Sequence, residues 1–136
     1  MTTIEVLKTI GEMGGRYKIS EFNSIGEYIF KMLTDKRIVD IEGFNGGRAI
    51  IFFSICDDYD PFYKKDTWTY RPHFPDGNIA YIEKLISTKW DREMRELFEN
   101  EILKHYPNAE FGVWHRFAKW GDRKVMRRRM KKHEYV

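Results

Sequence analysis

A single carboxylate interrupts an apolar stretch in the second half of the chain. Glu83 would share one face of a regular strand with Ile79, Tyr81 and Leu85. Removal from water disfavours the charged form of a carboxylate, which makes this group a candidate general base. The alternative interpretation is a glutamate at the rim of a sheet, paired with a neighbouring lysine, because strands seldom bury an unpaired carboxylate.

Two histidines are further candidates for proton transfer. His73 and Asp76 lie three positions apart in the loop Pro72–Gly77, where the carboxylate could orient the imidazole as a base. Turn formation alone also explains an Asp-Gly pair, so these two residues have a purely structural alternative. His115, at the end of a predicted strand, could act as an acid or a base, although a histidine that is exposed or has its hydrogen bonds satisfied is more common.

Basic residues are concentrated at the C-terminal end. The chain of 136 residues has a formal net charge of +3, but residues 116–136 hold nine lysines and arginines against two acidic residues. Aromatic side chains are interleaved with these cations, a pattern typical of surfaces that bind phosphate backbones. A charged terminal helix that only improves solubility is the alternative. The candidate residues for binding nucleic acid or an acidic partner are Arg116, Lys119, Trp120, Arg123, Lys124, Arg127, Arg128 and Arg129.

Composition and motifs exclude several classes of protein. Hydrophobic residues make up 42% of the chain, which supplies a core for one domain. The single cysteine, Cys56, permits neither an internal disulfide nor a cysteine-based zinc site, and no other metal site is predicted. No apolar run approaches the roughly 20 residues of a membrane span, and no secretory signal is recognised, so we expect a cytoplasmic protein. The absence of a Walker loop and of a nucleophile elbow argues against NTPases and serine hydrolases.

Two amphipathic helices are predicted in the first part of the chain. Apolar residues recur with a helical period over residues 4–13 and again over residues 25–33. Ser24 and Glu27 have the spacing of a capping box, which predicts that the second helix begins immediately after Ser24.

The central part of the chain is predicted to form strands around one long helix. The runs Ile38–Ile41 and Arg48–Ile55 flank turn-forming residues and predict a β-hairpin whose apolar second strand lies inside a sheet. Residues 66–71 have the composition of a strand or an extended lid. Strands at 78–86 and 109–116 enclose a helix, and this order predicts a parallel pair joined by a crossover.

The ends of the long helix and the basic segment complete the predicted elements. Thr88 and Asp91 have the spacing of a second capping box at the start of the helix. The helical period places Glu101 among the apolar residues of its inner side. Residues 123–133, which follow a Gly-Asp break, are expected to be helical or frayed.

The order of these elements resembles the core of the GNAT-type N-acyltransferases. The resemblance covers residues 24–116 and rests mainly on the stretches Asp76–Ile86, Glu93–Phe98 and Glu110–Arg116. The chain looks like the short GNAT-like proteins of bacteriophages and, more distantly, like the lysine acyltransferases that activate bacterial toxins. The implied fold is a single α/β domain over residues 1–119, with a mixed sheet flanked by helices, followed by a basic extension over residues 120–136.

The resemblance also implies an activity and a place for the donor. In the family, two parallel strands diverge, and acyl-coenzyme A lies between them with its pyrophosphate on backbone amides at the start of the next helix. The implied function is transfer of an acyl group from a thioester, carried by coenzyme A or an acyl-carrier protein, to an amine on a macromolecule. The usual glycine-rich loop is absent here. The residues that the resemblance places at the anion-binding corner are Ser87, Thr88, Lys89, Arg92 and Arg95.

Two other functions fit the same sequence. A GNAT-shaped protein without catalytic activity could bind nucleic acid or protein through its basic end. The chain could also be a component of a virion or another assembly. Loss of nucleic-acid binding on deletion of the residues after Lys119, with no acyl chemistry, would favour the first of these.

Overall fold

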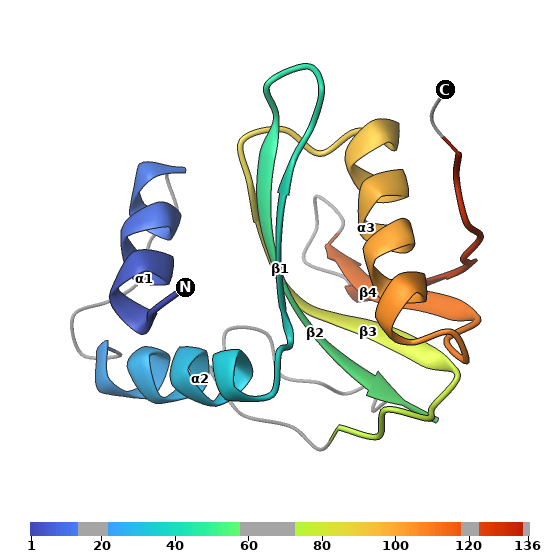
Figure 1. The fold of residues 1–136 in the computed structure, drawn as a ribbon, viewed down its shortest axis with the longest axis horizontal. Helices are drawn as coiled ribbons and strands as arrows, with labels where there is room; N and C mark the ends of the chain where they lie inside the picture. The colour runs from blue at the N-terminus through green and yellow to red at the C-terminus, as the bar shows by residue number, and fades with distance from the viewer. Residues whose placement is uncertain (14–21, 58–72, 118–122, 135–136) are drawn as a thin grey trace.

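The computed structural model describes residues 1–13, 22–57, 73–117 and 123–134 (Figure 1). The predicted mixed α/β architecture is confirmed in these ranges. The expected strand or lid at 66–71 and the candidate residues Lys119 and Trp120 lie outside them. In chain order the elements are α1 (Thr3–Glu12), α2 (Phe22–Thr34), β1 (Ile38–Glu42), β2 (Arg48–Cys56), β3 (Ile79–Ser87), α3 (Arg92–His105), β4 (Phe111–Phe117) and β5 (Arg123–Arg129).

The strands form one mixed sheet in the order β1-β2-β3-β4-β5. Strands β3 and β4 are parallel, and every other neighbouring pair is antiparallel. Helix α3 makes the connection between the two parallel strands, as the sequence predicts. Figure 1 shows α1 and α2 on one side of the sheet and α3 on the other.

Strand β2 contributes side chains to a core on each face of the sheet. Ala49, Ile51 and Phe53 belong to the core that α3 covers, whereas Ile50 and Phe52 belong to the core beneath α1 and α2. All residues of β2 after Arg48 are buried. The apolar run that predicted this strand therefore reflects burial on both of its faces.

Helix starts are predicted less well than helices. Helix α1 agrees with the predicted range, and the hydroxyl of Thr2 caps it by accepting a hydrogen bond from the backbone N–H of Glu5. Helix α2 begins at Phe22, so Ser24 lies inside its first turn and the predicted capping box is wrong. None of the described helices is long and apolar enough to cross a bilayer.

The basic C-terminal segment is part of the sheet. Residues 123–129 form β5, whose seven residues pair with the seven residues of β4, so the expectation of a helical or frayed segment is wrong. Met130 follows and is buried against the core on the α3 side, close to Gly112. A strand rich in arginine is stable here because a neighbouring strand supplies its hydrogen bonds, and composition carries little information about such pairing.

Candidate functional site

The parallel strands β3 and β4 are paired over only part of their length. Beyond the pairs, β3 continues to Ser87 beside β2, and β4 continues to Phe117 beside β5. The inner edges of residues 82–87 and 114–117 are not paired with each other. An extended ligand that carries amide groups could form hydrogen bonds with such edges. The pairs that do form are Ile79 with Phe111, Ala80 with Gly112, and Tyr81 with Val113.

His115 lies in the unpaired part of β4. It is two residues beyond Val113, so its side chain projects from the same face of the strand. Its ring stands edge-on to Tyr81, with 5.6 Å between the ring centroids. Both imidazole nitrogens are shielded from solvent. Among the predicted acid–base residues, His115 is placed at the point where the two strands cease to pair.

A β-bulge determines the position of Glu83. The pairing of β3 with β2 shifts between Phe52 and Phe53, which leaves Glu83 as the extra residue on β3. A bulge shifts the alternation of side chains beyond it. Leu85 therefore faces the side of the sheet opposite to Tyr81, and the single apolar stripe predicted around Glu83 is wrong.

Glu83 forms a buried ion pair with Arg37, which lies between α2 and β1. The Nη2 atom of Arg37 is 2.9 Å from Oε2 of Glu83, and both side chains are fully buried. The Nε–H of Arg37 donates to the carbonyl of Phe53 at 2.9 Å, and Nη1 is 3.5 Å from Asp35. Arg37 balances the charge of this buried carboxylate, which gives Glu83 a structural role in this arrangement. The sequence suggested either an apolar environment for Glu83 or an ion pair with a lysine at the rim of the sheet. The structure instead pairs Glu83 with a buried arginine.

His73 forms a hydrogen bond with the backbone of β2. Its Nδ1 accepts a hydrogen bond from the N–H of Ile55 at 3.1 Å, and its ring stands edge-on to Tyr106. Burial lowers the pKa of His73, and the positive charge of Arg37 lowers it further. Asp76 is exposed, and the structure does not bring its carboxylate into contact with His73.

Acidification is expected to weaken folding through His73. Because the folded-state pKa is lowered, the unfolded chain takes up a proton near pH 6.5 while the folded protein does not. The stabilising contribution is therefore complete above that pH and is lost as the pH falls toward the folded-state pKa. The free energy of unfolding in urea is measured at about pH 7.5 and at about pH 5.5. Its decrease between the two pH values should be smaller for His73→Asn than for the unchanged chain. Equal losses would contradict the assignment.

Asp91 occupies the start of α3, where the resemblance places a phosphate group. Its carboxylate accepts a hydrogen bond from the backbone N–H of Met94 at 3.0 Å and thereby caps the helix. That hydrogen bond, together with the ammonium group of Lys89 at 3.3 Å, lowers the pKa of Asp91. A fixed negative charge therefore stands at this helix terminus and opposes the binding of a second anion.

Of the other residues of this predicted corner, Thr88, Lys89 and Arg92 have polar partners within the protein. The Thr88 hydroxyl accepts a hydrogen bond from the backbone N–H at the start of β2, so the predicted capping box with Thr88 is wrong. Ser87 ends β3 and is half-buried. The side chain of Arg92 is 81% exposed and lies 3.0 Å from Glu96, whereas Arg95 is half-buried.

The turn between β1 and β2 covers the same end of α3. A carboxylate oxygen of Glu93 accepts a hydrogen bond from the backbone N–H of Phe44. A Cβ atom at Gly43 would lie only 2.6 Å from that carboxylate and 2.7 Å from the sulfur of Met94. The turn therefore approaches the helix closely, and a side chain at position 43 would require the side chains of Glu93 and Met94 to move.

The arginines of β5 divide between two faces. The guanidinium groups of Arg127 and Arg129 lie over the ring of Phe111, at 3.8 and 4.7 Å from its centroid. In contrast, Nε of Arg128 lies 3.2 Å from Glu99 of α3. The predicted basic set is therefore not one continuous surface. The far end of the same strand pair carries Arg116, Arg123 and Lys124.

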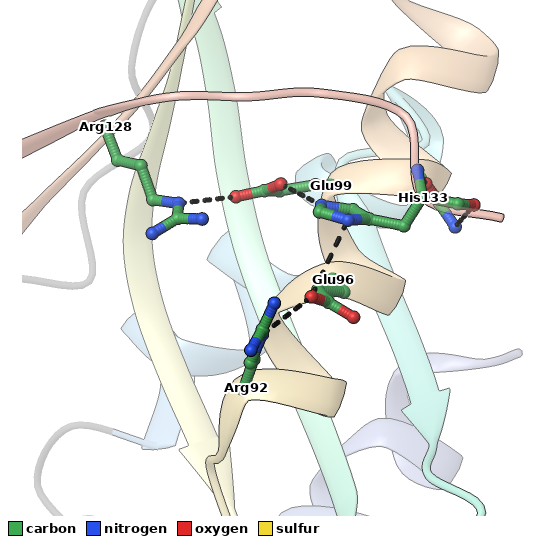
Figure 2. A network of polar contacts seen from close by, with 6 residues as sticks. Arg92, Glu96, Glu99, Arg128 and His133 are labelled. Carbon is green, nitrogen blue, oxygen red and sulfur yellow. Dashed lines mark hydrogen bonds and ion pairs between the residues drawn. The ribbon is translucent and has the colours of Figure 1, made fainter. Parts of the chain in front are cut away.

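Glu99 fastens the C-terminal segment to α3 (Figure 2). Its side chain is only 3% exposed, and Oε2 lies 2.6 Å from Nε2 of His133. The other carboxylate oxygen accepts from Nε of Arg128. The side-chain amide of Asn100 forms hydrogen bonds of 2.8 and 2.6 Å with the backbone of His133. These contacts join one helix to residues about 30 positions later in the chain.

Sequence reasoning missed this network. The helical period pointed to Glu101, but Glu101 is partly exposed and pairs with His105. Glu96 extends the network, since it lies 3.6 Å from His133 and also contacts Arg92. No local pattern marks Glu99, because its partners come from β5 and the segment that follows it.

A groove of about 620 Å³ lies between β1 and α3, and Glu101 and His105 are among the residues that line it. Val39, Phe53, Leu97 and Tyr106 are among its lining residues, and none of the predicted site residues contributes to it. Within the described ranges, no three His, Cys, Asp or Glu side chains are grouped to hold a metal ion. No protein-family model, curated protein or solved structure matches the chain.

Proposed function

We propose that this protein is an acyltransferase that moves an acyl group from a thioester to an amine on a macromolecule, as its resemblance to the GNAT-type enzymes implies. The observation that supports the proposal is the early end of the β3–β4 ladder. Three residue pairs form, and both strands then continue beside their outer neighbours without pairing with each other. Two adjacent strand edges offer hydrogen-bonding groups to an extended donor arm.

The geometry favours a donor without a diphosphate at the helix start. The unpaired strand edges suit the amide groups of an extended thioester arm. The carboxylate of Asp91 and the turn over α3 do not suit the diphosphate of coenzyme A, so the residues present do not fit that part of the cofactor. A thioester on an acyl-carrier protein is therefore the donor that we favour.

His115 is the group that we assign to proton transfer. In the reaction, the amine nitrogen bonds to the thioester carbonyl carbon, the carbon–sulfur bond breaks, the nitrogen loses a proton and the thiolate gains one. His115 is a side chain of suitable chemistry in the unpaired part of β4, and its ring nitrogens are shielded from solvent beside Tyr81. Glu83 is less suited, because Arg37 balances its charge.

Thiol release from two donors tests the proposal. The purified chain is mixed with a lysine-rich peptide and either acyl-carrier-protein thioester or acyl-coenzyme A. We expect thiol release and an increase in peptide mass, faster with the carrier protein. His115→Gln should slow release by about tenfold or more. His105→Gln, which changes an exposed histidine at the end of α3, is the control and should not slow release. The absence of transfer from both donors would overturn the proposed function.

A further inference from the structure

Two arginines of β5 are held together over one aromatic ring. Alternate residues of a strand project to the same side and lie about 7 Å apart, which places Arg127 and Arg129 on one face. Both guanidinium carbons lie over Phe111. A guanidinium that stacks through its flat face keeps the N–H groups at its edge available to a ligand. The ring therefore restrains two cations without consuming their donors.

Positive charge dominates this edge of the sheet. The side chain of Arg129 is 70% exposed, and the exposed residues Lys131 and Lys132 follow β5. One carboxylate, Glu110, lies 3.8 Å from Arg129, but its side chain is 55% exposed and such a surface pair is weak. Nine basic residues against two acidic ones in 116–136 make this the basic end of a chain that is otherwise net acidic.

Arg128 differs in role from the arginines on either side of it. Its Nε contacts the buried carboxylate of Glu99, so it fastens β5 to α3. Arg127 and Arg129, one residue to either side, are exposed. The alternation of the strand thus turns a run of three arginines into one structural cation and two that face solvent.

We propose that Arg127 and Arg129, held over Phe111, form a nucleic-acid-binding surface that contacts the phosphate backbone. Arginine forks match phosphate oxygens in bidentate geometry, and closely spaced arginines suit the regularly repeated anions of a nucleic acid. Contacts of this kind carry no base recognition, so binding is independent of sequence and falls with salt. This surface does not depend on the proposed acyl transfer.

Fluorescence anisotropy with a labelled single-stranded oligonucleotide of roughly 20 nucleotides tests the surface across a salt series. Arg127→Ala/Arg129→Ala should weaken binding by about tenfold or more and reduce the slope of log K against log salt by about 1.4, the value for two lost phosphate contacts. Lys8→Ala/Lys31→Ala is the matched control. It removes the same charge from exposed positions of α1 and α2 and should leave the slope unchanged.

Three further measurements complete the test. Glu110→Gln removes a neighbouring negative charge and should tighten binding. Arg127→Lys/Arg129→Lys keeps both positive charges, so its salt dependence should stay close to that of the unchanged chain and not fall as in the double alanine variant. Polyglutamate of similar length serves as the competing ligand. Equal losses in the two double alanine variants, or tighter binding to polyglutamate than to the oligonucleotide, would overturn the proposal. Neither result bears on thiol release, so the two proposals fail separately.

Discussion

Replacing Arg37 with methionine is expected to lower the free energy of unfolding by about 3–5 kcal/mol. The substitution leaves the carboxylate of Glu83 in a fully buried position without the cation that lies 2.9 Å away. It also removes the hydrogen bond from Nε to the carbonyl of Phe53. Because domains of this size are only marginally stable, the loss should be large in urea unfolding followed by circular dichroism.

The double variant Arg37→Met/Glu83→Leu separates the ion pair from simple packing. Removing both charges takes away the uncompensated carboxylate, so at least half of the stability lost in Arg37→Met should return. A double variant that is less stable than Arg37→Met would show that Glu83 is not the group left uncompensated. A loss below about 1 kcal/mol in Arg37→Met would show that the pair is solvated.

The elements that the sequence predicts well are those with a strong local pattern. Strand β2 is a run of apolar residues because both of its faces are buried, and the β1–β2 hairpin has glycines where its turn requires them. Helix α1 has its apolar period and ends next to a glycine pair. In these segments, burial and local backbone preference favour the same structure. Either signal alone is therefore sufficient to predict the helix or strand.

The candidate site is predicted poorly because it depends on register and distant pairing. The bulge at Glu83 arises where β3 meets β2, and nothing near Glu83 in the sequence indicates an extra residue. The partner Arg37 lies 46 positions earlier. At the start of α3, both Thr88 and Asp91 can cap a helix, and the choice is made when Thr88 extends the β2–β3 pairing. Each outcome requires knowledge of the neighbouring strand.

Charged residues illustrate the same difficulty from the side of function. Among the candidates from sequence, Glu83, Lys89, Arg92 and Arg128 form ion pairs within the protein, and Arg129 lies near the exposed carboxylate of Glu110. In a chain with 33% charged residues, many charges serve the fold, and residue type alone does not separate them from those that meet a ligand. His115 and the pair Arg127 and Arg129 stand out only when strand pairing and exposure are known.

Replacing Glu99 with glutamine should release the C-terminal segment from α3. The carboxylate is almost fully buried and accepts hydrogen bonds from Arg128 and His133, two groups that β5 and the following residues bring to the helix. Glutamine has nearly the same volume but no charge, so it weakens both contacts without creating a cavity. We expect the free energy of unfolding to fall by about 2 kcal/mol, a value reduced because Arg128 is 40% exposed.

Glu101→Gln is the matched control for this change, two positions along the same helix. Glu101 is 43% exposed and has His105 as its polar partner, so its loss should change stability by no more than about 0.5 kcal/mol. Hydrogen exchange should distinguish the two variants more sharply. Glu99→Gln should increase amide exchange at residues 130–134, while α1 and α2 remain protected. The largest increase is expected at the backbone N–H of His133, which donates a hydrogen bond to Asn100. If both variants lose the same stability, or if exchange rises equally in α1, Glu99 does not fasten this segment.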